Sequence, residues 1–171
     1  MDRSTLFRVV LPVLAVLTTG CITLATNPLD VPFHPQSSPN RCGVNCLAMA
    51  FDYFRIPYDF AELDAQSFVP ALNGSPPELL ADVAETYGLR AEIENLDAAG
   101  IKSSLESGAL PIVFIPPAQG TFIGHFILVT RAGQNPQQIR AHDGKRRNRR
   151  LRLRDNTYVT LLLAPPRKGS G

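Results

Sequence analysis

A cysteine with a glutamine upstream and a glycine directly after it is the first candidate for chemistry in this chain. The stretch QSSPNRCGVNCLAM places Gln36 six positions before Cys42 and Gly43 immediately after it, and apolar residues at helical spacing follow. A helix start favours a thiolate, because the macrodipole and the unpaired first-turn N–H groups lower the cysteine pKa from about 8.5. We therefore predict that Cys42 is a nucleophile. Its own N–H and the Gln36 amide would donate to an oxyanion, and Gly43 would let a substrate backbone approach closely.

A thiol nucleophile needs a base, and the chain offers three histidines. His125 opens an apolar, strand-like run after a glycine-punctuated loop, so we expect it at the mouth of a strand. Asp143 ends the next strand and is expected to face the His125 ring from there, fixing its tautomer as the third member of a triad. His142 should point to the opposite face of that strand. His34 precedes a proline and suits a loop or edge position.

These residues resemble the bacteriocin-processing, double-glycine-leader cysteine peptidases of the papain clan. In that family a glutamine precedes the nucleophile by the same interval, a Cys-Gly-x-x-Cys-Leu-Ala-Met helix start carries the nucleophile, and a Gly-His-Phe strand and an Asp follow. The matching positions here are Gln36, residues 42 to 49, residues 124 to 126 and Asp143, and the resemblance covers residues 31 to 163. It implies a papain-like fold and a thiol peptidase mechanism that uses neither a cofactor nor a metal.

The chain departs from that family in two ways. The family usually has Asp-Pro where this chain has Asp143-Gly144. Family members are often the N-terminal domain of a cytoplasm-facing ABC exporter, whereas this chain is too short for a transporter and begins with an export signal. We therefore expect a substrate other than an exporter's leader peptide, and specificity for a Gly-Gly site stays open.

The N-terminal segment has the layout of an export signal. Arg3 and Arg8 are followed by an apolar run from 9 to 17, which is shorter than the roughly 20 residues of a spanning helix. LTTGC, which ends at Cys21, resembles the lipobox of bacterial lipoproteins, whose cysteine is lipid-modified and becomes the mature N-terminus. An ordinary secretory signal is the alternative. We expect a lipid-anchored protein of the cell envelope, in the inner leaflet of the outer membrane or otherwise on the periplasmic side.

Hydrophobic periodicity predicts an α+β fold. Helices are expected first, at 42–54, 60–68, 77–87 and 98–107, with Asn40 and Ser75 as the N-caps of the first and third. Strands are expected at 89–95, 110–115, 125–131, 138–143, 150–154 and 157–163. This order indicates N-terminal helices packed on a mainly antiparallel C-terminal sheet.

The domain organisation follows from these segments. About 150 mature residues suit one domain with a single core. We assign residues 1–20 to a lipoprotein signal peptide, 21–30 to a tether, 31–165 to the papain-like peptidase domain and 166–171 to a disordered tail.

Positive charge gathers in one stretch although the formal net charge is only +2. Strand alternation over 145–154, KRRNRRLRLR, predicts a solvated hairpin with Leu151 and Leu153 facing inward and arginines facing outward. The alternative is contact with anionic lipid or an acidic partner. The arginines available for it are Arg146, Arg147, Arg149, Arg150, Arg152 and Arg154. Export argues against nucleic acid as a target.

The remaining alternatives concern the cysteines and the function. Cys46 lies one turn after Cys42, and burial in the core is its expected role. A metal site built from Cys42, Cys46 and His125 is disfavoured, because structural zinc sites hold cysteines in a knuckle rather than on a helix. A disulfide between the two cysteines stays open. The favoured function is an envelope cysteine peptidase that cleaves a peptide or protein substrate through a thiol acyl-enzyme. The alternative is a non-catalytic, peptidase-like lipoprotein that holds a peptide.

Overall fold

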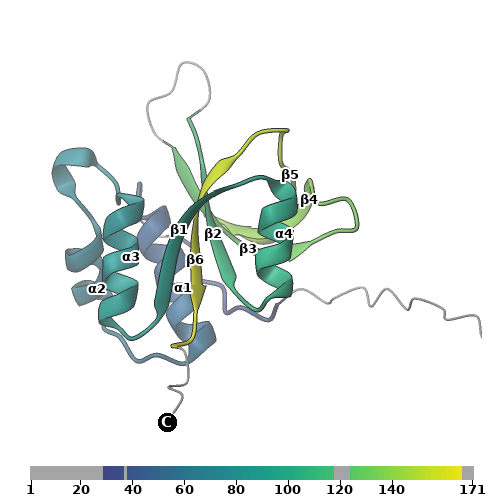
Figure 1. The fold of residues 1–171 in the computed structure, drawn as a ribbon. Helices are drawn as coiled ribbons and strands as arrows, with labels where there is room; N and C mark the ends of the chain where they lie inside the picture. Colours follow the sequence, from purple (N-terminus) through teal and green to yellow (C-terminus); the bar gives the residue numbers. More distant parts are fainter. Residues whose placement is uncertain (1–28, 37, 118–123, 167–171) are drawn as a thin grey trace, which may run out of the picture.

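The computed structural model describes residues 29–36, 38–117 and 124–166 (Figure 1). The expected signal peptide, the lipidation site at Cys21 and all but the start of the tail lie outside these residues, so the domain boundaries stay predictions. The helices that it describes are α1 (Cys42–Phe54), α2 (Phe60–Ser67), a 3₁₀ turn (Pro70–Leu72), α3 (Pro77–Thr86) and α4 (Ala98–Glu106). The strands are β1 (Arg90–Leu96), β2 (Leu110–Ile115), β3 (His125–Ala132), β4 (Gln138–Asp143), β5 (Arg146–Arg152) and β6 (Tyr158–Ala164).

The strands form a six-stranded sheet in the order β1-β6-β2-β3-β4-β5. Every neighbouring pair is antiparallel. β6, the last of the described strands, lies between β1 and β2, so the C-terminal strand joins the edge strand β1 to the rest of the sheet. The α+β fold class with helices on an antiparallel sheet is confirmed.

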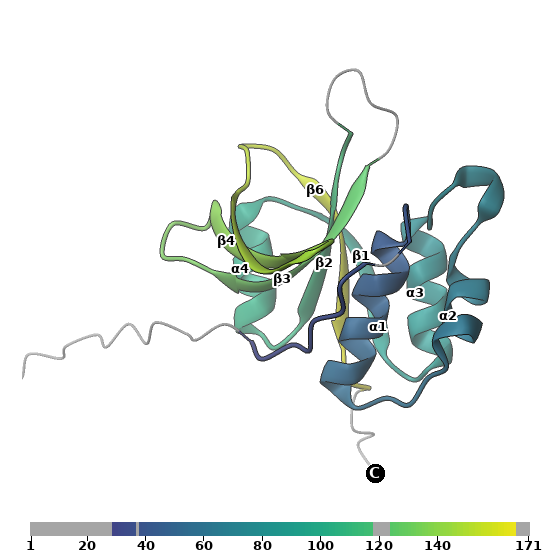
Figure 2. The ribbon, with the colours of Figure 1, turned by 180° about the vertical axis from the view of Figure 1, so that it is seen from behind.

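Helices cover both faces of the sheet, which gives the domain two cores (Figures 1 and 2). On one face α1 packs against β3 and α3 against β1 and β6, whereas α4 packs on the other face against β1, β2 and β3. Strand alternation sorts the side chains: Phe126 and Leu128 belong to the core under α1, while Ile127 and Val129 belong to the core under α4. The helix α1 is therefore fixed against the strand that begins at His125.

Two helix starts differ from the expected caps. Arg41, rather than Asn40, occupies the N-cap of α1 without a side-chain cap bond, because Asn40 adopts a left-handed conformation with φ of 60°. Pro76, rather than Ser75, occupies the N-cap of α3, and the buried Ser75 hydroxyl has no hydrogen-bond partner. The first-turn N–H groups of α1 are thus not covered by a capping side chain, which leaves them available at the position of Cys42.

The arginine-rich stretch forms a β4–β5 hairpin, as expected, although β5 begins at Arg146 and is longer than predicted. The hairpin turns at Gly144, whose φ of 55° favours glycine. Leu153 is buried and Leu151 half-buried, whereas the arginines of this stretch are exposed. No helix among the described residues combines the length and the apolar character that crossing a membrane requires.

Candidate active site

The fold brings three of the predicted residues together from distant parts of the chain. Cys42 is the first residue of α1, His125 the first of β3 and Asp143 the last of β4. The packing of α1 on β3 places the Cys42 thiol beside the start of β3, where the Phe126 N–H donates to Sγ at 3.4 Å. Cys42 also shares a side-chain hydrogen bond with His125. The backbone donor from Phe126 was not foreseen, because it depends on how a helix docks on a strand.

The imidazole of His125 is held between a carboxylate and the thiol. Its Nε2–H donates to Asp143 Oδ1 at 2.6 Å. This leaves the other ring nitrogen, Nδ1, for the hydrogen bond with Cys42. The order of contacts is thiol, imidazole and carboxylate, which is the arrangement predicted from the sequence.

A second cation, missed by the sequence analysis, holds the carboxylate of Asp143. Arg149 donates from its guanidinium to Asp143 Oδ2, so both carboxylate oxygens have a charged or polar partner. Arg149 was assigned only to the basic patch, because sequence spacing does not reveal which side of the hairpin turns toward Asp143. The register shift of the β4–β5 pair between Ala141 and Asp143 lies next to this contact.

The charges of the three groups reinforce one another. Burial alone would raise the pKa of the Cys42 thiol, but the hydrogen bonds from His125 and from the Phe126 N–H outweigh it and lower that pKa. The hydrogen bond to Cys42 raises the pKa of His125 against the effect of burial, and Asp143 adds to the rise. Burial opposes ionisation of Asp143, yet Arg149 and His125 bring its pKa below the ordinary value. These shifts favour a thiolate and imidazolium pair.

Gln36 lies beside this group but not in contact with the thiol. Its backbone N–H donates to the Gly144 carbonyl at 3.1 Å, and its side-chain Nε2 donates to the Ser38 carbonyl at 2.8 Å. A Cβ on Gly144 would lie 3.9 Å from both Gln36 Oε1 and His125 Cε1, so both side chains lie next to this turn. The amide nitrogen has two hydrogens, and one remains to donate to a ligand.

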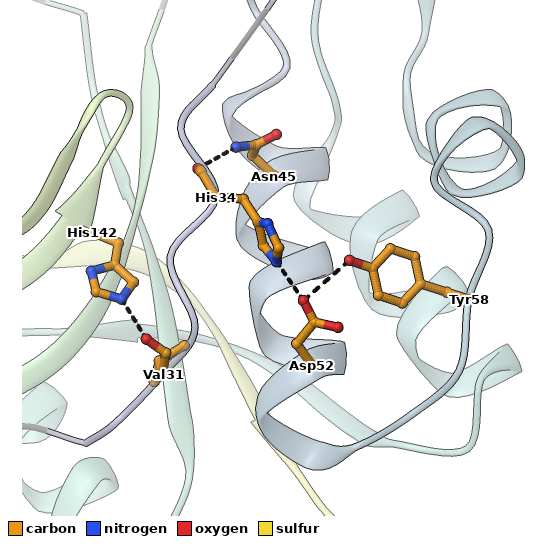
Figure 3. A network of polar contacts seen from close by, with 6 residues as sticks. All are labelled: Val31, His34, Asn45, Asp52, Tyr58 and His142. Carbon is orange, nitrogen blue, oxygen red and sulfur yellow. Dashed lines mark hydrogen bonds and ion pairs between the residues drawn. The ribbon is translucent and has the colours of Figure 1, made fainter.

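The entry segment, residues 29–36, carries Gln36 and is anchored along its length (Figure 3). The Val31 carbonyl accepts from His142 Nε2 at 3.0 Å, and the His34 carbonyl accepts from Asn45 Nδ2 at 2.8 Å. The His34 ring pairs with Asp52, which also accepts from Tyr58. Gln36 therefore sits on a segment fixed to α1 and to β4.

His142 occupies a structural position, as strand alternation predicted. It is 1% exposed, and the Asn148 N–H donates to its Nδ1 at 3.1 Å while its Nε2 contacts Val31. Burial lowers the pKa of His142, with Arg147 and His34 acting in the same direction. His34 pairs with Asp52 at the surface. Of the three histidines, only His125 contacts the thiol.

Gly43 has a different role from the one expected. A Cβ at this position would lie 3.0 Å from Leu80, 3.1 Å from Ser75 and 3.2 Å from Phe126. The glycine is therefore needed where α1, α3 and β3 pack closely, rather than at a surface where a substrate passes.

Cys46 belongs to the core, as predicted. It is 2% exposed, both cysteines are free, and burial raises the pKa of the Cys46 thiol well above its ordinary value. Within the part of the chain that the structure describes, no group of three or more His, Cys, Asp or Glu side chains has the arrangement of a metal site.

A hollow of about 360 Å³ opens beside the His125–Asp143 pair. Its lining combines apolar side chains, among them the buried Leu153 and Tyr158, with arginines. The remaining lining residues are Ile115, Pro116, Pro117, Ile127, Arg149, Leu151, Arg152, Arg154 and Asn156. One side of the His125–Asp143 pair is therefore accessible from this hollow, whose lining does not include Cys42.

Comparison with protein families identifies the class of this domain. The model of the Peptidase C39 family matches residues 30–162, nearly all of the described part of the chain. The chain therefore belongs to the Peptidase C39 family, in agreement with the resemblance noted in the sequence. No curated protein matches the sequence.

Two solved structures share the fold at low sequence identity. A double glycine motif protease from an AMS/PCAT transporter, solved in complex with the leader peptide, is 18% identical with a TM-score of 0.64. It covers 81% of this chain, and 94% of its own length is matched. The peptidase domain of Streptococcus ComA, a bifunctional ABC transporter involved in a quorum-sensing pathway, is 19% identical with a TM-score of 0.62. The match covers 79% of this chain and 98% of that one.

Proposed function

We propose that this protein is a cysteine peptidase in which Cys42, His125 and Asp143 form the catalytic triad. The observation that carries the proposal is the chain of contacts among these three residues. The Cys42 thiol, at a helix N-terminus, shares a hydrogen bond with the His125 imidazole, which donates to the Asp143 carboxylate at 2.6 Å. The lowered pKa of Cys42 and the raised pKa of His125 support a reactive thiolate next to a proton donor.

The mechanism is acyl transfer in two halves. The Cys42 thiolate attacks the scissile carbonyl, and the imidazolium of His125 gives its proton to the departing amine, which leaves a thioester on Cys42. Water then attacks the thioester while His125 takes one of its protons. The acid product leaves, and the thiolate and imidazolium pair is restored. Asp143 keeps the ring oriented in both halves.

The oxyanion of each half would be bound by backbone and amide donors. The Cys42 N–H lies in the uncapped first turn of α1, and Gln36 has a free amide hydrogen beside the site. The Gln36 side chain must turn from the Ser38 carbonyl toward Cys42 to complete this pocket. Family membership and the neighbour solved with a leader peptide support a peptide substrate, and cleavage after a Gly-Gly site remains to be measured.

Alkylation tests the active-site assignment directly. Iodoacetamide at pH 6 should modify Cys42 rapidly and leave Cys46 unmodified, since the latter is buried and has a raised pKa. Cys46 is thus an internal control in the same chain, read by mass spectrometry of the two peptides. Equal slow rates at both cysteines would contradict an activated thiol.

A comparison of cells tests cleavage and finds the substrate. Envelope proteins from cells that carry the wild-type chain should show N-termini that are absent when Cys42→Ala replaces it. The Cys42→Ala protein should keep its helix content and melting temperature, because the mutation removes one half-buried sulfur atom. An identical set of N-termini in the two cell types would contradict a peptidase role.

We further propose that the mature protein is a lipoprotein of the envelope, anchored through Cys21. The sequence LTTGC supports this, and Ile22 in the next position is typical of lipoproteins sorted to the outer membrane in diderm bacteria. Two acyl chains would hold the protein stably, since each buried methylene contributes about 0.8 kcal/mol. Mass spectrometry of the mature N-terminus should give a diacylated Cys21, and an unmodified peptide starting elsewhere would refute the anchor while leaving the Cys42 chemistry untouched.

A further inference from the structure

Three arginines lie in register across three consecutive strands. Arg131 on β3 is the cross-strand partner of Arg140 on β4, and Arg140 is the partner of Arg150 on β5. We call Arg131, Arg140 and Arg150 the arginine row. Adjacent strands lie about 4.8 Å apart, so three guanidinium groups start from backbone positions within about 10 Å. The basic stretch predicted from the sequence contains only the last of them.

The row occupies the sheet face opposite α4, beyond the area that α1 covers. On β4 the neighbours of Arg140, Ile139 and Ala141, are buried in the core under α4, so Arg140 faces the other way. The three side chains line a hollow of about 560 Å³ with Arg152. The remaining lining residues are Gly133, Gln138, Ile139 and Leu151, and none of them is acidic.

The row also differs from the neighbouring arginines in its partners. Arg147 pairs with Asp30 and Arg149 with Asp143, whereas the described residues provide no salt bridge to the three members of the row. Like charges directly opposite one another destabilise a sheet. A row of uncompensated arginines is therefore a site for an external anion, and the fork of a guanidinium suits phosphate oxygens in particular.

The entry segment begins next to one member of the row, Arg131. The Leu29 N–H donates to the Thr130 carbonyl at 2.9 Å. Leu29 and Arg131 line one further hollow with Lys102 and Glu106 of α4, and these two side chains pair with each other. Figure 2 shows the start of the described chain beneath α4, next to the sheet. Cys21 lies eight residues before Leu29, a distance of at most about 26 Å when extended. A chain anchored at Cys21 would thus hold the row close to the bilayer.

We propose that the arginine row docks on the anionic phosphate headgroups of the membrane that anchors the protein. Several phosphates can meet the three guanidinium groups at once, and the described chain begins beside Thr130 and Arg131, at the margin of this surface. The orientation argument rests on the proposed anchoring at Cys21, whereas the binding itself does not need it. Docking orients the domain, and Arg149 stays in contact with Asp143 on a separate side of the hairpin.

Vesicle flotation tests the proposal with the chain from Ile22 to Gly171, which lacks Cys21. This part contains every described element, and the matched ComA peptidase domain was crystallised as a separate domain. The chain should float with vesicles of phosphatidylcholine mixed with phosphatidylglycerol and not with phosphatidylcholine alone. Arg131→Gln with Arg140→Gln and Arg150→Gln should weaken binding on the order of 100-fold, at about fivefold for each cation near an anionic surface.

A matched control removes the same charge from positions outside the row. Arg55→Gln, Lys145→Gln and Arg146→Gln take away three exposed cations outside the row and outside the hollow beside His125, and should weaken binding by less than about fivefold. The alkylation rate of Cys42 should be the same in both triple variants, which shows that the active site is intact. A changed rate in the row variant alone would overturn the separation of the row from the active site.

Several results would overturn the proposal. Equal losses in the two triple variants would mean that total charge, and not the row, attracts the protein. If the protein does not float with phosphatidylglycerol vesicles, a membrane surface is excluded as the ligand. The same holds if a low concentration of inorganic phosphate releases the protein from the vesicles. Binding of poly-glutamate that the row mutations abolish, without vesicle binding, would assign the row to an acidic protein partner. None of these results depends on whether Cys42 is catalytic.

Discussion

Two histidines on neighbouring strands, His125 at the start of β3 and His142 on β4, differ in exposure, in contacts and in the direction of their pKa shifts. His125 is at the open end of β3, where its side chain is 38% exposed and contacts a thiol and a carboxylate. His142 pairs in register with Leu128 further along β3, is 1% exposed, packs edge-on against the Phe33 ring, and its two ring nitrogens bond backbone groups. The pKa of His125 is raised and the pKa of His142 is lowered.

The difference teaches that the partners of an imidazole decide its role. An anionic neighbour on each side stabilises the charged form of His125. The Asn148 N–H donates to Nδ1 of His142, which requires that this nitrogen carry no proton, and Nε2–H donates to the Val31 carbonyl. His142 is thus held as a neutral ring that fastens the entry segment, while His125 is available for proton transfer.

The largest expected effect separates the two histidines. His125→Ala should lower kcat/KM by several orders of magnitude, because the proton carrier is lost, while the melting temperature changes little. His142→Ala should keep kcat within about tenfold and lower the free energy of unfolding by about 2–4 kcal/mol, since it leaves a cavity and unpaired backbone groups. Peptide cleavage and chemical denaturation measure the two quantities. An inactive but stable His142→Ala protein would reverse the comparison.

The next effect concerns Gln36, the proposed oxyanion donor on the entry segment. Gln36→Ala should lower kcat about 10²-fold, the usual scale for one lost oxyanion donor, with little change in stability because the side chain is half-buried. Gln66→Ala is the control, since Gln66 lies exposed on α2 and bonds only Glu62. Steady-state kinetics with one peptide substrate compare the kcat of the two variants with that of the wild type. An unchanged kcat would remove Gln36 from the site.

A smaller effect is expected from the second partner of Asp143. Arg149→Gln should lower kcat/KM about tenfold, the lower end of the cost of a lost hydrogen bond to a charged group. Because Arg149 lowers the pKa of Asp143, the variant should also lose activity at a higher pH on the acid side of its profile. Arg149→Lys should recover part of the loss, and Arg150→Gln should match the wild type. A profile without a shift would make Arg149 a surface residue only.

The smallest effect is the contribution of His142 to the pH dependence of stability. The folded pKa of His142 lies below the ordinary 6.5, so the unfolded chain binds more protons between these two values. Stability from this residue is complete above about pH 6.5 and falls as the pH drops toward the folded pKa. His142→Gln should lose less stability than the wild type between pH 7 and pH 5 in denaturant titrations. Equal slopes would show that His142 does not titrate in this range.

Local patterns were enough to predict much of the site. Helical spacing after Cys42 predicted its place at a helix start, and strand alternation placed His142 on the opposite face from Asp143. The β strand that starts at His125 was also expected. These features depend on periodicities of 3.6 and 2 residues, which the sequence carries directly.

Other features needed contacts between distant segments. Asn40 has the chemistry of a cap, yet a left-handed φ removes it from the cap position. Gly43 looked like a residue that admits substrate, whereas three packed side chains require its small size. The basic stretch appeared as one patch in the sequence, but the hairpin turns Arg149 toward Asp143 and Arg150 into the arginine row.

The sequence by itself determined that a helix begins at Cys42, that His125 and Asp143 end neighbouring strands, and that the chain is an α+β protein, because these depend on short-range spacing and composition. Only the tertiary structure decided the further contacts around these groups. The docking of α1 on β3 sets the Phe126 N–H against the thiol, and the β4–β5 register brings Arg149 to Asp143 and aligns Arg131, Arg140 and Arg150. Register and docking depend on the packing of residues far apart in the chain, which no local pattern records.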